Sequence, residues 1–173
     1  MNRRGALLGS FVFFWFAPAT VAGVIPWMLT RWRAQAASFG ASVLPWLGYV
    51  LVGAGASIVV ESFVRFAVKG LGTPAPVAPT VRLVVSGLYR YVRNPMYLGV
   101  LSVIVGQALV MGSALLLQYA VVVWLSFFAM VVLYEEPNLQ HRFGDSYERY
   151  RVNVPRWWPR TRPWHQDVEG RAS

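Results

Sequence analysis

The stretch "NPMYLGVLSVIVGQALVMGSALLLQYAVVVWLSFFAMVVLY", residues 94–134, carries no charged side chain. Its length of about 40 residues is twice the roughly 20 apolar residues that a helix needs to cross the hydrocarbon core of a bilayer. A Gly-Ser pair at positions 112–113 favours a turn near its middle. The stretch therefore predicts a helical hairpin over residues 96–134, with helices at 96–111 and 114–134. The first helix would cover about 24 Å, so a tilted or partly re-entrant hairpin is the alternative to two full spans.

The rest of the chain has the composition of a membrane protein. Of its 173 residues, 56% are hydrophobic and only 13% are charged, whereas soluble domains average about 25% charged residues. Two further apolar runs predict spans at residues 6–29 and 41–60. Within the second of these, Gly53 and Ser57 form a small-residue face that suits helix packing. We therefore predict an all-α integral membrane protein of one domain, with about four transmembrane helices.

The distribution of charge predicts the orientation and the partners. The chain has 16 Lys and Arg residues against 7 Asp and Glu residues. With the N-terminus inside, only Arg31 and Arg33 among these basic residues fall outside, so the positive-inside rule favours an N-in, C-in topology. A proline-rich loop at 70–95 and an amphipathic C-terminal segment at 135–173 then share the cytosolic face. The basic excess suits anionic lipid head groups rather than nucleic acid, and two distant histidines with no cysteine predict no metal site.

Two adjacent acids follow the uncharged stretch. Glu135 and Glu136 come after an apolar helix, whose C-terminal partial charge disfavours each carboxylate by about 0.3–1 kcal/mol. Pro137 disfavours helical geometry at Glu136, so we expect the helix to end or kink there. The two carboxylates need a cation: the structural interpretation is an interfacial ion pair, and the functional interpretation is a bound cationic ligand. The arginines available for an ion pair are Arg90, Arg93 and Arg142.

Three segments of the chain follow one another in an informative order: "LVVSGLYRYVRNPMYLG", the hydrophobic hairpin, and "YEEPNLQHRFGDSYERYRVNVPRWWPR". This order resembles the isoprenylcysteine carboxyl methyltransferase and phospholipid methyltransferase superfamily of integral-membrane enzymes. The resemblance covers roughly residues 70 to 160. The residues that match the family pattern are Gly87, Tyr89, Arg93, Asn94, Pro95, Tyr97, Gly99, Glu135, Glu136, Leu139, Phe143, Gly144, Tyr147 and Tyr150.

The resemblance implies methyl transfer from S-adenosylmethionine to a lipid or small hydrophobic acceptor, at a cytosol-facing site in a bacterial inner membrane. This cofactor carries a sulfonium, an ammonium and a carboxylate, so it needs groups of both charges and is favoured by aromatic rings. If the acceptor must lose a proton, Glu136 is the candidate catalytic base, with Tyr97 behind it. The residues expected to bind the cofactor are Val81, Arg82, Leu83, Val84, Tyr89, Arg93, Asn94, Pro95, Met96, Tyr97 and Glu135.

Two positions depart from the prenylcysteine enzymes. Asn94 stands where those enzymes have histidine, and Val131 stands where they place a substrate-contacting arginine. A prenylcysteine carboxylate would thus lack its counter-charge, so the acceptor group stays open among amine, thiol and carboxylate. Two other functions are alternatives: an NADPH-dependent membrane reductase of the sterol or steroid type, which shares a similar Arg-His-Pro-x-Tyr segment, and a non-catalytic scaffold that holds anionic lipid.

Overall fold

The computed structural model describes residues 18–33, 43–65 and 83–165, and these residues form helices and connecting segments without a β-strand. The prediction of an all-α fold is confirmed for these residues. The expected span at 6–29 is described only from residue 18 onward. The elements are η1 (Thr20–Val24), α2 (Ile25–Thr30), α3 (Leu44–Arg65), η3 (Gly87–Arg90), α4 (Pro95–Met111), α5 (Ala114–Met130), η4 (Val131–Glu135), α6 (Glu136–Phe143) and α7 (Asp145–Asn153).

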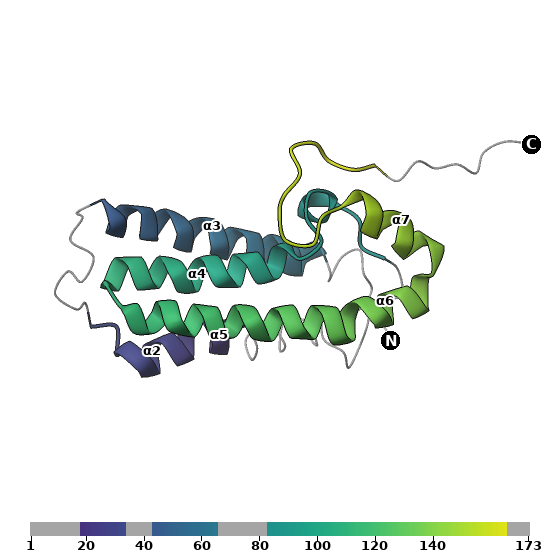
Figure 1. The fold of residues 1–173 in the computed structure, drawn as a ribbon. Helices are drawn as coiled ribbons and strands as arrows, with labels where there is room; N and C mark the ends of the chain where they lie inside the picture. The colour runs from purple at the N-terminus through teal and green to yellow at the C-terminus, as the bar shows by residue number, and fades with distance from the viewer. Residues whose placement is uncertain (1–17, 34–42, 66–82, 166–173) are drawn as a thin grey trace, which may run out of the picture.

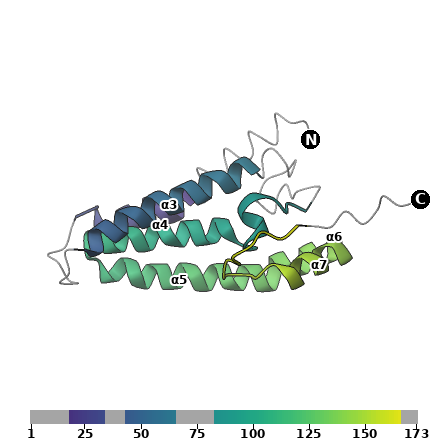
Figure 2. The same cartoon turned by 90° about the horizontal axis from the view of Figure 1, so that it is seen from above.

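Helices α3, α4 and α5 lie side by side (Figures 1 and 2). Gly112, in the left-handed region with φ 63°, ends α4, and the Ser113 side chain caps α5, so α4 and α5 form a hairpin. Two helices of the described residues are long and apolar enough to cross a bilayer: α3, with 22 residues, and the continuous helix Ala114–Phe143, with 30. Helix α4, with 17 residues, is shorter.

Four glycines bring α3 and α4 into close contact. A Cβ atom added at Gly48 would lie 2.6 Å from the carbonyl oxygen of Gly106, and one added at Gly55 would lie 2.6 Å from that of Gly99. All four residues are buried. In lipid, where there is little hydrophobic drive between helices, such close van der Waals packing holds neighbouring helices together. The glycines thus fix the position of α4, whose first turn carries part of the candidate site.

Side chains of the hairpin hold the first described helical segment. The amide nitrogen of Gln107 donates to the carbonyl of Ala22 at 2.6 Å, and the Tyr119 hydroxyl donates to the carbonyl of Val21 at 2.9 Å. Both carbonyls belong to η1, a π-helical turn, in which the backbone pairing departs from the α-helical pattern. Because an unpaired carbonyl is costly where water is excluded, these contacts stabilise the turn.

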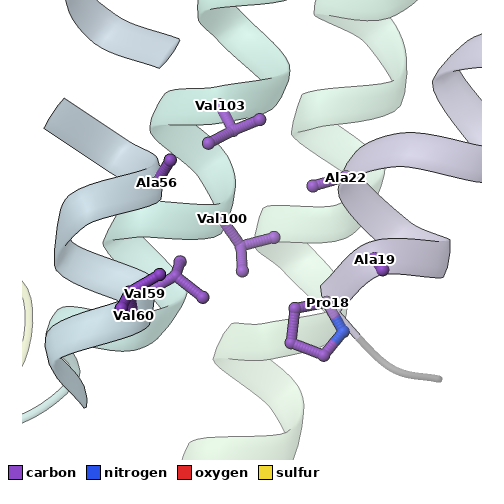
Figure 3. Close-up of a pocket in the computed structure, with 8 residues that line it drawn as sticks. All are labelled: Pro18, Ala19, Ala22, Ala56, Val59, Val60, Val100 and Val103. Carbon is purple, nitrogen blue, oxygen red and sulfur yellow. The ribbon is translucent and has the colours of Figure 1, made fainter. Parts of the chain in front are cut away.

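An apolar pocket of about 150 Å³ lies between this first segment, α3 and α4 (Figure 3). Its lining offers no side chain that could orient a polar group. The pocket therefore has the character of a gap in helix packing, and no chemistry follows from it. The lining residues are Pro18, Ala19, Ala22, Ala56, Val59, Val60, Val100 and Val103.

We expected the helix that starts at Ala114 to end or kink at Glu136, and the structure shows that it does not end there. A π-helical turn, η4, interrupts the α-helical pattern, and the helix continues as α6 with Pro137 in its first turn. A wider turn can accommodate proline, which lacks an N–H donor and crowds the preceding turn of a regular helix. Gly144, with φ 49° and ψ −124°, then reverses the chain into α7. Residues 154–165, here called the strap, return over η3 and the start of α4 (Figure 1).

Candidate active site

The strap is held to the segment before α4 by backbone hydrogen bonds. The Arg93 amide donates to the carbonyl of Pro155 at 2.9 Å, and the Arg160 amide donates to the carbonyl of Tyr91 at 2.9 Å. The strap also reaches α5, because the Trp157 ring stacks on Phe128 with centroids 6.4 Å apart. The strap therefore bridges the start of α4 and the outer face of α5.

A buried aromatic cluster anchors α7 beneath the strap. Tyr147, Tyr150 and Val154 are buried together, and Leu83 packs against them. The Tyr150 hydroxyl donates to the backbone carbonyl of Tyr89 at 2.7 Å. Burial raises the pKa of the Tyr150 phenol well above its ordinary value, so this hydroxyl stays protonated and keeps its donor at neutral pH. The cluster fixes α7 against η3, which carries Tyr89.

Glu136 is paired with two arginines. Nη1 of Arg93 donates to its Oε1 at 2.9 Å, and Arg156 forms a bidentate contact, with Nε at 2.6 Å from Oε1 and Nη2 at 2.7 Å from Oε2. The Glu136 side chain is only 13% exposed. These bonds raise the pKa of Arg156. Glu136 thus forms the ion pair that the structural interpretation expected. Because both of its carboxylate oxygens accept hydrogen bonds from arginines, the geometry argues against a role as catalytic base.

Glu135 has different surroundings. One of its carboxylate oxygens accepts a hydrogen bond from the Tyr97 hydroxyl. Among residues 18–33, 43–65 and 83–165, no basic side chain forms an ion pair with it. The ring of Tyr97 lies against Phe127, with centroids 4.5 Å apart. A half-buried carboxylate beside aromatic rings, with no protein cation, is suited to a positively charged ligand.

Two arginines before α4 have N–H groups without a hydrogen-bond acceptor among the described residues. Nη2 of Arg90 and Nε of Arg93 are buried and find no acceptor among the described residues. The Arg90 Nε atom donates to the carbonyl of Trp164 at 2.8 Å, which fixes that side chain under the strap. Because a buried guanidinium N–H without a partner is costly, a bound anion would stabilise both groups.

Most of the expected cofactor-binding residues from Val84 onward lie near one another in the structure. Asn94 stands just before α4 and donates through Nδ2 to the carbonyl of Arg156 at 3.1 Å. Pro95 and Met96 are buried in the first turn of α4, and Val84 is buried before η3. Val81 and Arg82 lie outside the described residues. The expected residues that converge at this end of the helices are Arg93, Asn94, Tyr97, Glu135 and Glu136.

Sequence reasoning missed the part played by Arg156. This residue is 20 positions after its partner Glu136, and the chain reverses between them. Arg90 and Arg142, which were expected as possible partners for the acids, are not paired with them among the described residues. The only signal for Arg156 in the sequence is its place in a basic, aromatic segment rich in proline.

Comparison with known proteins places the chain in a family. The family described as "Phospholipid methyltransferase" matches residues 43–146. Protein-S-isoprenylcysteine O-methyltransferase of Schizosaccharomyces pombe is 40% identical over 74 residues, which cover 42% of this chain and 31% of that protein. Protein-S-isoprenylcysteine O-methyltransferase B of Arabidopsis thaliana is 40% identical over 75 residues, covering 43% and 38%. The match thus spans about a third of the length of these curated relatives, and no solved structure matches significantly. The chain belongs to the phospholipid methyltransferase family.

Proposed function

We propose that this protein is an integral-membrane methyltransferase that uses S-adenosylmethionine to methylate a lipid or small hydrophobic acceptor. Family membership supports the type of reaction. In this proposal the chain crosses a bacterial inner membrane about four times, with both termini and the active site on the cytosolic side. The cofactor pocket is then formed by residues 83–97, the end of η4 with Glu135, the start of α6 and the strap.

The observation that carries the proposal is the difference between two adjacent carboxylates. Glu136 is neutralised by two arginines, whereas Glu135 has no cation among the described residues. Leftover donors of Arg90 and Arg93 belong to the same end of the bundle. A ligand with separate positive and negative groups fits this arrangement, because Glu135 can meet its positive group, and the N–H groups of Arg90 and Arg93 that have no acceptor among the described residues can meet its negative group. S-adenosylmethionine is such a ligand.

Each group of the site has a distinct role in the proposal. When bound, S-adenosylmethionine supplies an electrophilic methyl group on a positively charged sulfur. Glu135 holds the positive end of the ligand. The carboxylate of the ligand is bound by the N–H groups of Arg90 and Arg93 that have no acceptor in the described part of the chain. The Tyr97 hydroxyl orients the Glu135 carboxylate, and the strap excludes water above it. Methyl transfer depends mainly on positioning and on desolvation, and these groups provide both.

The structure also bears on the acceptor. Val131 is 1% exposed and packs inside the helix bundle. The chain therefore supplies no counter-charge at the position where the prenylcysteine enzymes place a substrate-contacting arginine. A buried carboxylate without a counter-charge is strongly disfavoured, so we propose an amine or a thiol on a hydrophobic molecule as the methylated group.

Ligand binding tests the proposal directly. The purified protein in lipid nanodiscs is titrated with S-adenosylhomocysteine in a calorimeter, and we expect saturable binding. In the same titration with sinefungin, an analogue that is positively charged at the sulfur position, Glu135→Gln should weaken binding by about tenfold for the loss of a charged partner. Asn94→Ala should weaken the binding of S-adenosylhomocysteine, and neither change should unfold the protein. Glu148→Gln, at a glutamate whose partner is the exposed Arg151, is the matched control.

Three results of this titration would contradict the proposal. Binding of NADPH in place of S-adenosylhomocysteine would support the reductase. Absence of binding to either ligand would favour a scaffold. Equal affinities of the wild type and both site variants would show that the site is misassigned.

A further inference from the structure

Arg156 touches both walls of the candidate site. Its guanidinium holds Glu136 at the start of α6 through two hydrogen bonds of 2.6 and 2.7 Å. Its backbone carbonyl accepts a hydrogen bond of 3.1 Å from Asn94, just before α4. The side chain of Arg160, the next arginine of the strap, donates through Nη1 to the backbone carbonyl of Asn153, and among the described residues it forms no ion pair with Glu135 or Glu136. Arg156 therefore links the start of α6, through its guanidinium, to the segment before α4, through its backbone carbonyl.

Arg156 also decides how many free carboxylates the site contains. Oε2 of Glu136 has Arg156 as its hydrogen-bond partner, while Oε1 is shared between Arg156 and Arg93. Without Arg156, Glu136 would keep one arginine and present a second carboxylate oxygen directly after Glu135 in the chain. A positively charged ligand would then have two anionic groups to choose from. Two competing partners would loosen its position, which methyl transfer cannot tolerate.

We propose that Arg156 is a positioning residue of the proposed methyl-transfer site. Its guanidinium keeps Glu136 neutralised, so that Glu135 alone meets the positive charge of the ligand. The contact with Asn94 belongs to the backbone carbonyl of the same residue and stays in place when the side chain is changed. This inference rests on the proposed function, because it needs a cationic ligand at Glu135. The strap would then not only cover the site but also determine which of the two carboxylates binds the positive charge of the ligand.

Two ligands that differ by one positive charge test the inference without an identified acceptor. S-adenosylhomocysteine has a neutral sulfur, and sinefungin carries an amine at the position of the transferred methyl group. The ratio of their dissociation constants therefore reports how strongly the site binds a cation at that position. We expect the wild type to prefer sinefungin and Glu135→Gln to lose this preference.

The informative variant is Arg156→Met. It frees Oε2 of Glu136, so it should shift the ratio toward sinefungin by about three- to tenfold. In Arg156→Met/Glu136→Gln the second carboxylate is gone, and the ratio should return to the wild-type value. Arg160→Met removes an equal charge from the same strap but leaves Glu136 paired, and it should leave the ratio unchanged. If Arg156→Met does not fold, Arg156→Gln removes the charge while keeping polar contacts, and the same shift is expected.

The outcomes separate the inference from the function on which it rests. If the wild type binds neither ligand, the proposed function fails. If it binds both but Arg156→Met and Arg160→Met give the same ratio as the wild type, Arg156 is only a strap anchor and the inference is wrong. A shift in Arg156→Met that persists in the double variant would also overturn it, because the shift would then not come from Glu136.

Discussion

Glu135 and Glu136 are separated by about 100° around the helix axis, so their carboxylates meet different partners. Glu135 points to the Tyr97 hydroxyl, and Glu136 to the arginines Arg93 and Arg156. The sequence identifies both acids as unusual and names Arg93 as one possible partner. It does not show which acid is paired, because Arg156 approaches only after the reversal at Gly144 and the whole of α7.

Removing the charge of Glu136 should destabilise the protein more than removing that of Glu135. Glu136→Gln leaves two arginines without their counter-charge, at a site where Glu136 is 13% exposed and Arg156 30% exposed. Breaking a fully buried pair costs about 3–5 kcal/mol, and the partial exposure of Arg156 reduces this to roughly 1–3 kcal/mol. Thermal unfolding in detergent measures the difference, with Glu135→Gln as the matched variant. Equal melting temperatures would contradict the assignment of Glu136 as the structural acid.

Tyr150 should make the stability of the protein depend on alkaline pH. Burial raises the pKa of its phenol in the folded state, whereas the unfolded phenol titrates near its ordinary value of about 10. Its contribution is therefore complete below about pH 10 and is lost as the pH rises from there toward the folded-state pKa. Melting temperatures measured between about pH 8 and pH 11 should fall above the unfolded-state pKa. The fall should be smaller in Tyr150→Phe but unchanged in Tyr49→Phe, which alters an exposed tyrosine of α3.

Helix α3 shows most clearly that a pattern of small residues does not identify which face of a helix packs against its neighbour. Small residues occur on two of its faces, and we expected Gly53 and Ser57 to pack against another helix. Both are exposed in the structure, and nothing lies within 4 Å of a Cβ built at Gly53. The packing face is instead that of Gly48 and Gly55. Because nearly every face of a membrane helix is apolar, periodicity cannot distinguish the side that faces lipid from the side that faces protein.

The two faces of α3 can be compared by a single methyl group. Gly55→Ala places a Cβ 2.6 Å from the carbonyl oxygen of Gly99, so α3 and α4 must separate. We expect a loss of about 1–3 kcal/mol, in the range for overpacked cores. Gly53→Ala adds the same methyl on the exposed face and should be neutral or slightly stabilising. Melting temperature and elution volume of the two variants in detergent provide the test, and similar behaviour would refute the glycine contact.

The π turn η4 is the element that sequence reasoning only half anticipated. Pro137 signals a disturbance of the helix at the right place, but proline at a helix start and proline after a π turn have the same sequence signature. The structure selects continuation: the helix runs on to Phe143. This continuation places Glu136 at the start of α6, within reach of the strap, rather than in a loop.

At the scale of the whole molecule, the proposed topology can be tested by labelling single cysteines introduced into the chain. The protein contains no cysteine, so a single introduced thiol reports its own location. Arg33→Cys and His165→Cys alter exposed residues of the described structure. In intact cells a membrane-impermeant maleimide should label Arg33→Cys and leave His165→Cys unlabelled until the membrane is opened. The reverse pattern would invert the topology, and labelling of both would place them on one side.

The two helices of the hairpin differ greatly in length. Helix α4 has 17 residues, whereas the continuous helix Ala114–Phe143 has 30, a difference of about 20 Å at 1.5 Å per residue. The longer helix extends past the start of α4, and Glu135 and Glu136 lie in this extension, where Arg156 of the strap contacts Glu136. Under the proposed function, a water-soluble methyl donor and an oil-soluble acceptor can meet there without either of them leaving its own phase.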